Sequence, residues 1–186
     1  MTKCGLLALV WSVGAAISLG GQAPTADELV KSGLAKARAE HKNVLIDFHA
    51  SWCPWCKQLD ALYEDPQFAE KFRKSYVIVP ITVIERPSLK AKTNDGWDAL
   101  MFKYRKHKDQ DIPYVVILGP TGKPLADSFE RYGSALPNNA GFPQTPEEID
   151  AYIKQISETG KGFQFADLAK LRTFFVNVRG KSHGGH

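Results

Sequence analysis

The sequence predicts an α/β domain in which helices cover both faces of a central β-sheet. Apolar runs typical of buried strands alternate with segments of helical periodicity. The chain has 186 residues, of which 44% are hydrophobic and 24% charged, and this suits one compact domain with short additions. The composition excludes a disordered, collagen-like or multi-span membrane chain. The net charge of +4 is small and gives little support for nucleic-acid binding.

Capping residues and prolines predict the element boundaries in the first half of the chain. Thr25 and Glu28 have the spacing of a capping box. Pro54 suits the first position of a helix, and Asp65 suits the N-cap of the shorter helix that follows. Pro80 interrupts an apolar run, so that strand is expected at a sheet edge. The expected elements are helices over 25–40, 54–63, 66–72 and 97–107, strands over 44–48 and 76–84, and a polar loop over 87–96.

The second half is expected to form a β-hairpin and two helices. A turn rich in Gly and Pro separates the two hairpin strands, and Thr145 and Glu148 form a second capping box. The last helix carries aromatic and aliphatic residues at roughly helical spacing, which fits either packing on the domain or a dimer or partner surface. The expected elements are strands over 114–118 and 125–129, a loop over 134–144, helices over 145–157 and 163–178, and a disordered tail over 179–186.

The first twenty residues have the pattern of a secretory signal peptide. Lys3 is their single charge, and an apolar run from Gly5 to Leu19 follows, with cleavage favoured after Gly20. The alternative is an uncleaved membrane anchor, but a span needs about 20 apolar residues, and this run is shorter. We therefore expect a signal peptide over 1–20, a domain over 25–160, and a C-terminal amphipathic helix with a tail over 161–186.

The cysteine pair Cys53 and Cys56 lies where a buried strand turns into a helix. Cys53 would sit at the helix N-terminus, where free amides and the helix dipole stabilise a thiolate. Cys56 follows one turn later and is expected to be shielded. An exposed nucleophilic thiol with a shielded resolving thiol is what dithiol–disulfide exchange needs.

Two other interpretations of the pair stay open. The cysteines could form a permanent structural disulfide, or half of a zinc site. Zinc usually takes four ligands, and the chain has no second cysteine pair and no finger-like histidine spacing. Redox exchange is therefore the favoured interpretation, with no bound metal or organic cofactor expected.

The segment from Val44 to Lys57, VLIDFHASWCPWCK, resembles the active-site strand and turn of thioredoxins. Ile112 and Pro113, just before a strand, are similar to the Ile-cis-Pro element of that family. The resemblance covers roughly residues 25–158. It implies a thioredoxin-like fold with a mixed sheet, and a thiol-disulfide oxidoreductase activity.

The resemblance also implies roles for residues at matching positions. Cys53 would be the nucleophile and Cys56 the resolving thiol, joined as a redox disulfide when oxidised. Asp47 matches the buried carboxylate that carries a proton for the resolving cysteine, and its pKa should be raised by burial; a hydrogen-bonded structural aspartate is the alternative. Pro113 would be cis and face the disulfide. The residues expected to contact substrate are Trp52, Pro54, Trp55, Ile112 and Pro113.

The chain departs from the thioredoxin pattern beside the cysteines. Pro54 and Trp55 stand where thioredoxins usually have Gly-Pro, and this pair tunes the redox potential in the family. His49 replaces an often aromatic residue and, by strand alternation, shares a face with Asp47. It is either a packed, hydrogen-bonded histidine or a residue that tunes the Cys53 thiolate, and Lys57 is a second candidate for tuning.

These observations predict an exported, periplasmic or extracytoplasmic oxidoreductase of bacterial type that acts on protein disulfides. Ile112 and Asp47 favour a reductase, which would need an electron donor such as a membrane redox partner. Pro54 favours the alternative of a disulfide oxidase or isomerase. A further alternative is a thioredoxin-fold module that binds clients without catalysis. The oligomeric state is not predicted.

Overall fold

The fold was analysed on a computed structural model, which describes residues 23–106, 109–128, 130–131, 134–135 and 139–183. The signal-peptide prediction for residues 1–20 lies outside these residues. Within them, no helix combines the length and the apolar character that crossing a membrane requires.

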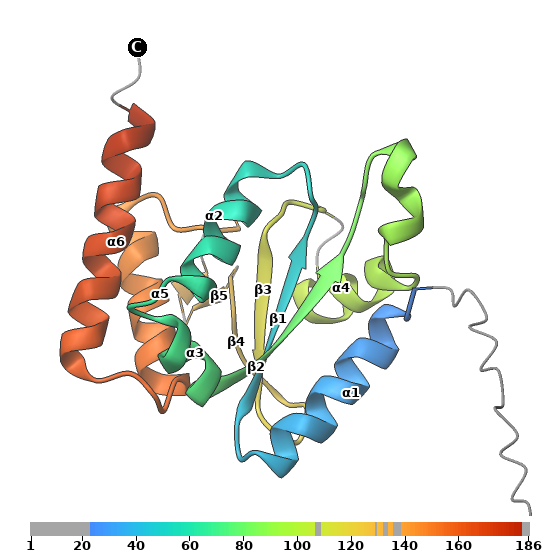
Figure 1. Cartoon of the computed structure of the whole chain (residues 1–186), viewed down its shortest axis with the longest axis horizontal. Coiled ribbons are helices and arrows are strands. Elements are labelled where there is room, and N and C mark those ends of the chain that lie inside the picture. Colours follow the sequence, from blue (N-terminus) through green and yellow to red (C-terminus); the bar gives the residue numbers. More distant parts are fainter. Residues whose placement is uncertain (1–22, 107–108, 129, 132–133, 136–138, 184–186) are drawn as a thin grey trace, which may run out of the picture.

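A four-stranded sheet forms the centre of the molecule, in the order β2-β1-β3-β4 (Figure 1). β1 pairs in parallel with β2 and antiparallel with β3, which in turn pairs antiparallel with β4. The sheet is therefore mixed, and the predicted fold class is confirmed. The strands are β1 (Asn43–His49), β2 (Tyr76–Thr82), β3 (Tyr114–Leu118) and β4 (Pro124–Asp127).

Helices cover both faces of this sheet (Figure 1). One face packs against α1 (Ala26–Ala39) and α4 (Trp97–Arg105). The other packs against α2 (Pro54–Glu64), α3 (Ala69–Ser75), α5 (Pro146–Thr159) and α6 (Phe165–His183).

Alternation along β1 sends neighbouring side chains into different cores. Val44, Ile46 and Phe48 lie in the core beneath α1, whereas Leu45 lies in the core beneath α2. Asp47 has the parity of Leu45, so strand geometry turns it toward the face that α2 covers. β1 is thus buried on both faces, as its continuous apolar sequence predicts.

Several sequence signals have the predicted structural result. Thr25 and Thr145 each cap a helix through a complete capping box. Pro54 occupies the first turn of α2, with Cys53 as the N-cap. Pro80 is exposed on β2, an edge strand of the sheet.

The predicted start of the short third helix is wrong. Asp65 is the C-cap of α2, and its carbonyl oxygen accepts hydrogen bonds from the amides of Phe68 and Ala69, at 2.8 and 2.7 Å. Its carboxylate also accepts from the Gln67 amide at 2.8 Å. These bonds close a turn over residues 66–68, so α3 begins only at Ala69.

Three further boundaries differ from the prediction. The polar loop after β2 contains a 3-10 helix, η1 (Pro87–Lys92). β5 (Glu130–Arg131) lies just before the predicted loop over 134–144, and it pairs with β6 (Ser134–Ala135), which occupies the first two residues of that loop. α6 continues to His183, so the tail expected to be disordered from residue 179 begins as helix.

Candidate functional site

Cys53 and Cys56 form a disulfide at the N-terminus of α2. Their Cα atoms lie 5.3 Å apart. The Cys53 sulfur also accepts a hydrogen bond from the Cys56 amide, at 3.2 Å, which satisfies one of the free amides at the helix start. Backbone dipole and amide therefore both point at Cys53 Sγ, the arrangement that stabilises negative charge on this sulfur once the disulfide is open.

Cys53 is less exposed than the sequence led us to expect. It is only 3% exposed, and Cys56 is fully buried. Ala50 and the half-buried Ile84 and Ile112 pack against the pair, which explains the low exposure of Cys53. In this disulfide form Cys53 alone of the pair keeps accessible surface.

The Ile112–Pro113 peptide bond is cis, as the resemblance implies. The carbonyl oxygen of Ile112 lies 3.8 Å from Cys53 Sγ, so this loop borders the disulfide. The Pro113 carbonyl oxygen points elsewhere and accepts a hydrogen bond of 2.7 Å from the side chain of Asn139. The loop thus presents the Ile112 carbonyl beside the reactive sulfur, whereas the Pro113 carbonyl is hydrogen-bonded to Asn139.

Two tryptophans flank the disulfide and are partly exposed. Trp52 donates a hydrogen bond from Nε1 to the Ile84 carbonyl oxygen at 2.9 Å. Trp55 stacks on Phe142, with ring centroids 5.4 Å apart. A small groove of about 170 Å³ runs between Trp55, Phe142 and the cis-proline loop. A larger hollow of about 490 Å³ between α6 and the turn before α3 is lined by none of the cysteine-site residues.

Gly141 is a site residue that the sequence did not reveal. A Cβ at this position would lie 1.7 Å from the Pro113 carbonyl oxygen, so only glycine permits this close approach of two backbone segments. The segment carrying Gly141 therefore packs directly against the backbone of the cis-proline loop.

Asp47 is buried, with 1% of its surface exposed, and its Oδ1 has no hydrogen-bond partner among the described residues. Burial raises its pKa to about 7, and the neighbouring Asp60 adds to the shift while His49 opposes it. The pKa of Asp47 is therefore raised in the direction that the sequence predicted.

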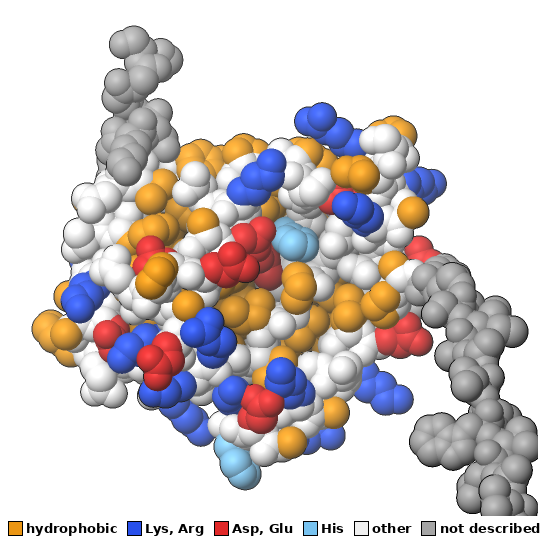
Figure 2. Space-filling model, viewed as in Figure 1, with side chains coloured by type: hydrophobic (Ala, Val, Ile, Leu, Met, Phe, Trp, Pro, Cys, Tyr) orange, Lys and Arg blue, Asp and Glu red, His pale blue; other side chains and the backbone are white. Residues whose placement is uncertain are grey.

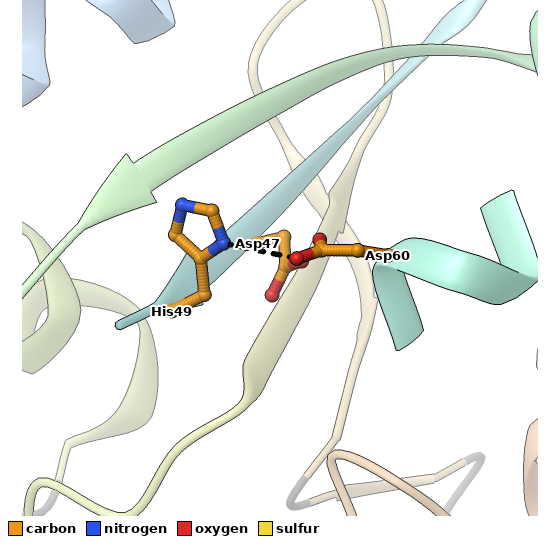
Figure 3. Close-up of side chains that lie close together, drawn as sticks. All are labelled: Asp47, His49 and Asp60. Atoms are coloured by element: carbon orange, nitrogen blue, oxygen red, sulfur yellow. Dashed lines mark ion pairs between the residues drawn. The ribbon is translucent and has the colours of Figure 1, made fainter. Parts of the chain in front are cut away.

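His49 lies beside Asp47, as strand alternation predicts, but its nearest charged partner is Asp60 on α2 (Figure 3). The distance from His49 Nδ1 to Asp60 Oδ2 is 3.7 Å. The Asp60 carboxylate raises the pKa of His49 and outweighs the opposing effect of burial. Sequence reasoning missed Asp60, although its place four residues after Cys56, one helical turn along α2, was an available signal.

The remaining predicted residues occupy the rim of the site. Pro54 and Lys57 are exposed on the first turn of α2. Glu85 was not predicted, yet its carboxylate accepts hydrogen bonds from the backbone amide and hydroxyl of Ser51, at 2.6 and 2.7 Å. This contact fixes the turn between β1 and Cys53 to the segment that follows β2.

The sequence model of the family described as Thioredoxin-like matches residues 25–120. The chain belongs to the thioredoxin-like family. The matched segment runs from the N-cap of α1 to just past β3 and includes both the cysteine pair and the cis-proline loop of this thioredoxin-like chain.

Two curated relatives are similar over part of their length. The thiol:disulfide interchange protein DsbD of Vibrio cholerae is 25% identical over 128 residues, which make up 68% of this chain and 18% of that protein. Thioredoxin H4 of Arabidopsis thaliana is 38% identical over 56 residues, or 30% of this chain and 45% of that protein. The thioredoxin-like chain thus spans less than half the length of each relative.

Solved structures give matches of modest similarity. A crystal structure of a disulphide isomerase from Xylella fastidiosa Temecula1 has a TM-score of 0.49 and 20% identity, covering 85% of this chain and 94% of that one. The oxidised C-terminal domain of Neisseria meningitidis DsbD has a TM-score of 0.37 and 24% identity, covering 55% and 84%.

Proposed function

We propose that this chain is a thiol-disulfide oxidoreductase that exchanges its Cys53–Cys56 pair with protein disulfides. The observation that carries the proposal is the position of Cys53, the N-cap of α2, where its sulfur accepts the Cys56 amide hydrogen bond. A cysteine so placed has its thiolate stabilised, and Cys56 lies one turn away to resolve a mixed disulfide.

The exchange itself balances within the pair. The Cys53 thiolate attacks one sulfur of the substrate disulfide, forming a mixed disulfide and releasing the other substrate sulfur as a thiolate. Cys56 then loses its proton and attacks Cys53 Sγ, which releases the second substrate thiolate and restores the internal disulfide. Asp47 is the proposed acceptor of the Cys56 proton, because a carboxyl with a pKa of about 7 exchanges protons readily near neutral pH.

The groove beside the disulfide suits an extended polypeptide. Trp55 and Phe142 give it an apolar wall, and the Ile112 carbonyl borders Cys53 Sγ. A backbone carbonyl at this place could accept an amide hydrogen bond from an extended peptide, as in strand addition. This supports protein disulfides as the substrate class.

In this proposal electrons flow from the Cys53–Cys56 pair to the substrate, so the chain acts as a reductase. Asp47 and the Ile112–Pro113 pair resemble thioredoxins, whose redox pair is a reductant, while Pro54 favours an oxidase. The DsbD relative is named as a thiol:disulfide interchange protein, which supports disulfide exchange as the reaction. An extracytoplasmic location, with a membrane redox partner as electron donor, is part of the proposal. The apolar N-terminal segment supports export.

Cysteine variants test the proposal. The wild-type chain, supplied with dithiothreitol as electron donor, should accelerate reduction of a protein disulfide such as that of insulin. Cys53→Ser should abolish the acceleration, and Cys56→Ser should instead accumulate a mixed disulfide with substrate, visible by mass spectrometry. Equal acceleration by wild type and Cys53→Ser would exclude catalysis by the pair. If Cys53→Ser also keeps its binding to client proteins, the alternative of a binding module without catalysis would be favoured.

A further inference from the structure

Three ionisable side chains lie close together where α2 packs on β1 (Figure 3). Asp47 and His49 come from β1, and Asp60 comes from α2. One oxygen or nitrogen atom of each lies within 4.8 Å of the corresponding atoms of the other two. The cluster is built into the fold, because β1 alternation turns Asp47 and His49 to the face against which α2 packs.

Asp47 is the buried member of this cluster, and within the described part of the chain one of its carboxylate oxygens lacks a partner. Its Oδ1 atom is buried and has no hydrogen-bond partner among the residues that the structure describes. A buried oxygen without a partner costs free energy, and an ionised one costs more unless an opposite charge is bound to it. A cation held between the three side chains would offset the charge of the ionised Asp47 carboxylate, one oxygen of which lies in the cluster.

We propose that Asp47, His49 and Asp60 form a binding site for a divalent cation of the zinc class. One imidazole nitrogen and two carboxylate oxygens are a ligand set that Zn²⁺ uses, with water in the fourth position. The two carboxylates cancel the charge of the ion. Mg²⁺ and Ca²⁺ prefer six or more oxygen ligands, so this mixed set of three favours Zn²⁺ over both.

The geometry needs only a small closure around the ion. Zinc–ligand bonds of about 2.0–2.2 Å put the ligand atoms of a tetrahedral site about 3.3–3.6 Å apart. The pair His49 Nδ1 and Asp60 Oδ2 is already at 3.7 Å. The Asp60 side chain is 46% exposed and that of His49 is 22% exposed, so Asp60 is free to rotate and solvent provides the entry path.

Binding has a consequence for exchange that rests on the proposed function. The ion would occupy the Asp47 carboxylate and release any proton it holds to solvent. Asp47 would then no longer accept the Cys56 proton, so Zn²⁺ should slow disulfide exchange reversibly, and EDTA should restore it.

The binding test uses the full chain in its disulfide form, in which the cysteines offer no thiolate ligand. His183 and His186 are replaced by Ala in every sample, since the C-terminal histidines would add a competing site. Zn²⁺ is titrated against a chromophoric chelator at pH 7.5. We expect one equivalent to bind, with His49→Phe and Asp60→Asn each weakening it by about tenfold or more, since even the loss of an outer-shell partner costs that much.

Controls on the same elements make the test specific. Glu64→Gln removes an exposed carboxylate one turn further along α2 and should leave Zn²⁺ affinity unchanged. Circular dichroism checks that each variant is folded, and Asp47→Asn serves as a third ligand variant. A millimolar excess of Mg²⁺ should not displace Zn²⁺.

Absence of saturable binding, or equal affinity in the wild-type background and all three ligand variants, would overturn the site. This measurement involves no turnover, so its result is independent of whether the cysteine pair exchanges with substrate. An exchange rate that saturating Zn²⁺ leaves unchanged would overturn the consequence for catalysis.

Discussion

Asp47 is the residue at which the apolar strand and the proposed chemistry meet. Its neighbours along β1 are fully buried aliphatic and aromatic side chains, so the carboxyl is removed from water together with them. Desolvation is the largest cause of its raised pKa, about 7. The same burial that fits Asp47 for proton exchange near neutral pH should therefore cost stability when it ionises.

Asp47→Asn should remove a pH dependence of stability. The folded protein holds the Asp47 proton up to about pH 7, whereas the unfolded chain releases it near about pH 3.9. Because the folded state binds more protons in this window, the free energy of unfolding should fall as pH rises from about 4 to 7, by at most on the order of 4 kcal/mol. Urea unfolding of both proteins between pH 4 and 8, with EDTA present, measures this. Identical slopes in the two proteins would contradict it.

Strand periodicity predicts which site residues share a face of β1, but not which residues of other elements pack against that face. His49 and Asp47 could be placed on the same side of β1 from sequence, and the structure brings them together. Asp60 lies one helical turn after Cys56, but that spacing alone does not place it beside Asp47 and His49, because the packing of α2 on β1 depends on contacts distant in sequence. The burial of Cys53 has the same origin, since Ile84 and Ile112 come from two other segments.

At the scale of elements, the cis-proline loop depends on a neighbouring backbone segment. Gly141 lies against the Pro113 carbonyl, and Asn139 from the same segment donates a hydrogen bond to that oxygen and another, of 3.1 Å, to the Asp111 carbonyl. This segment also contributes Phe142, on which Trp55 stacks. These contacts join the segment to both sides of the proposed substrate groove.

Gly141→Ala should displace this loop. The added methyl would overlap the Pro113 carbonyl, a backbone atom that cannot rotate away. We expect a loss of about 1–3 kcal/mol in unfolding free energy, in the range of overpacking substitutions, and slower disulfide exchange. Gly119→Ala is the matched control, since its Cβ would meet neighbours no nearer than 3.7 Å. Equal stability and exchange rate in the two variants, measured by urea unfolding and insulin reduction, would exclude this role.

The type of an element was predictable where one local sequence signal dominates. The prediction of its boundary was wrong where two local signals favour different structures. The capping boxes at Thr25 and Thr145 and the edge proline at position 80 each give the expected result. Asp65 suits a helix N-cap, but it also suits a turn, and its hydrogen bonds to the amides of residues 67–69 favour the turn. Sequence alone gives no means to rank these two uses of one side chain.

At the scale of the whole molecule, α6 is joined to the site through aromatic contacts. Phe175 is fully buried and contacts Phe142 and Tyr152, with ring centroids 5.3 and 5.0 Å away. Phe142 in turn stacks on Trp55 beside the cysteines. The C-terminal helix thus packs on the core that supports the groove, as the packed-helix interpretation expects. The face in Figure 2 shows apolar, acidic and basic side chains interspersed.

Phe175→Ala should destabilise the entire chain. Removal of a fully buried phenylalanine costs about 3–5 kcal/mol, and the cavity would lie against Phe142 and Tyr152. Val176→Ala, at the next position but 52% exposed, should change stability by only about 0.5 kcal/mol. Thermal and urea unfolding compare the two. A Phe175→Ala loss no greater than that of Val176→Ala would show that α6 does not stabilise the domain.

The redox equilibrium of the Cys53–Cys56 pair with glutathione tests the central claim most directly. Trp52 and Trp55 flank the pair, and their fluorescence should report its opening. We expect one reversible two-electron transition with a potential near the about −270 mV of thioredoxin, and none in Cys53→Ser. A potential near about −120 mV would instead make the chain a disulfide donor and contradict the proposed direction. A pair that stays oxidised at every glutathione ratio, and under excess dithiothreitol, would be a structural disulfide and would contradict the account as a whole.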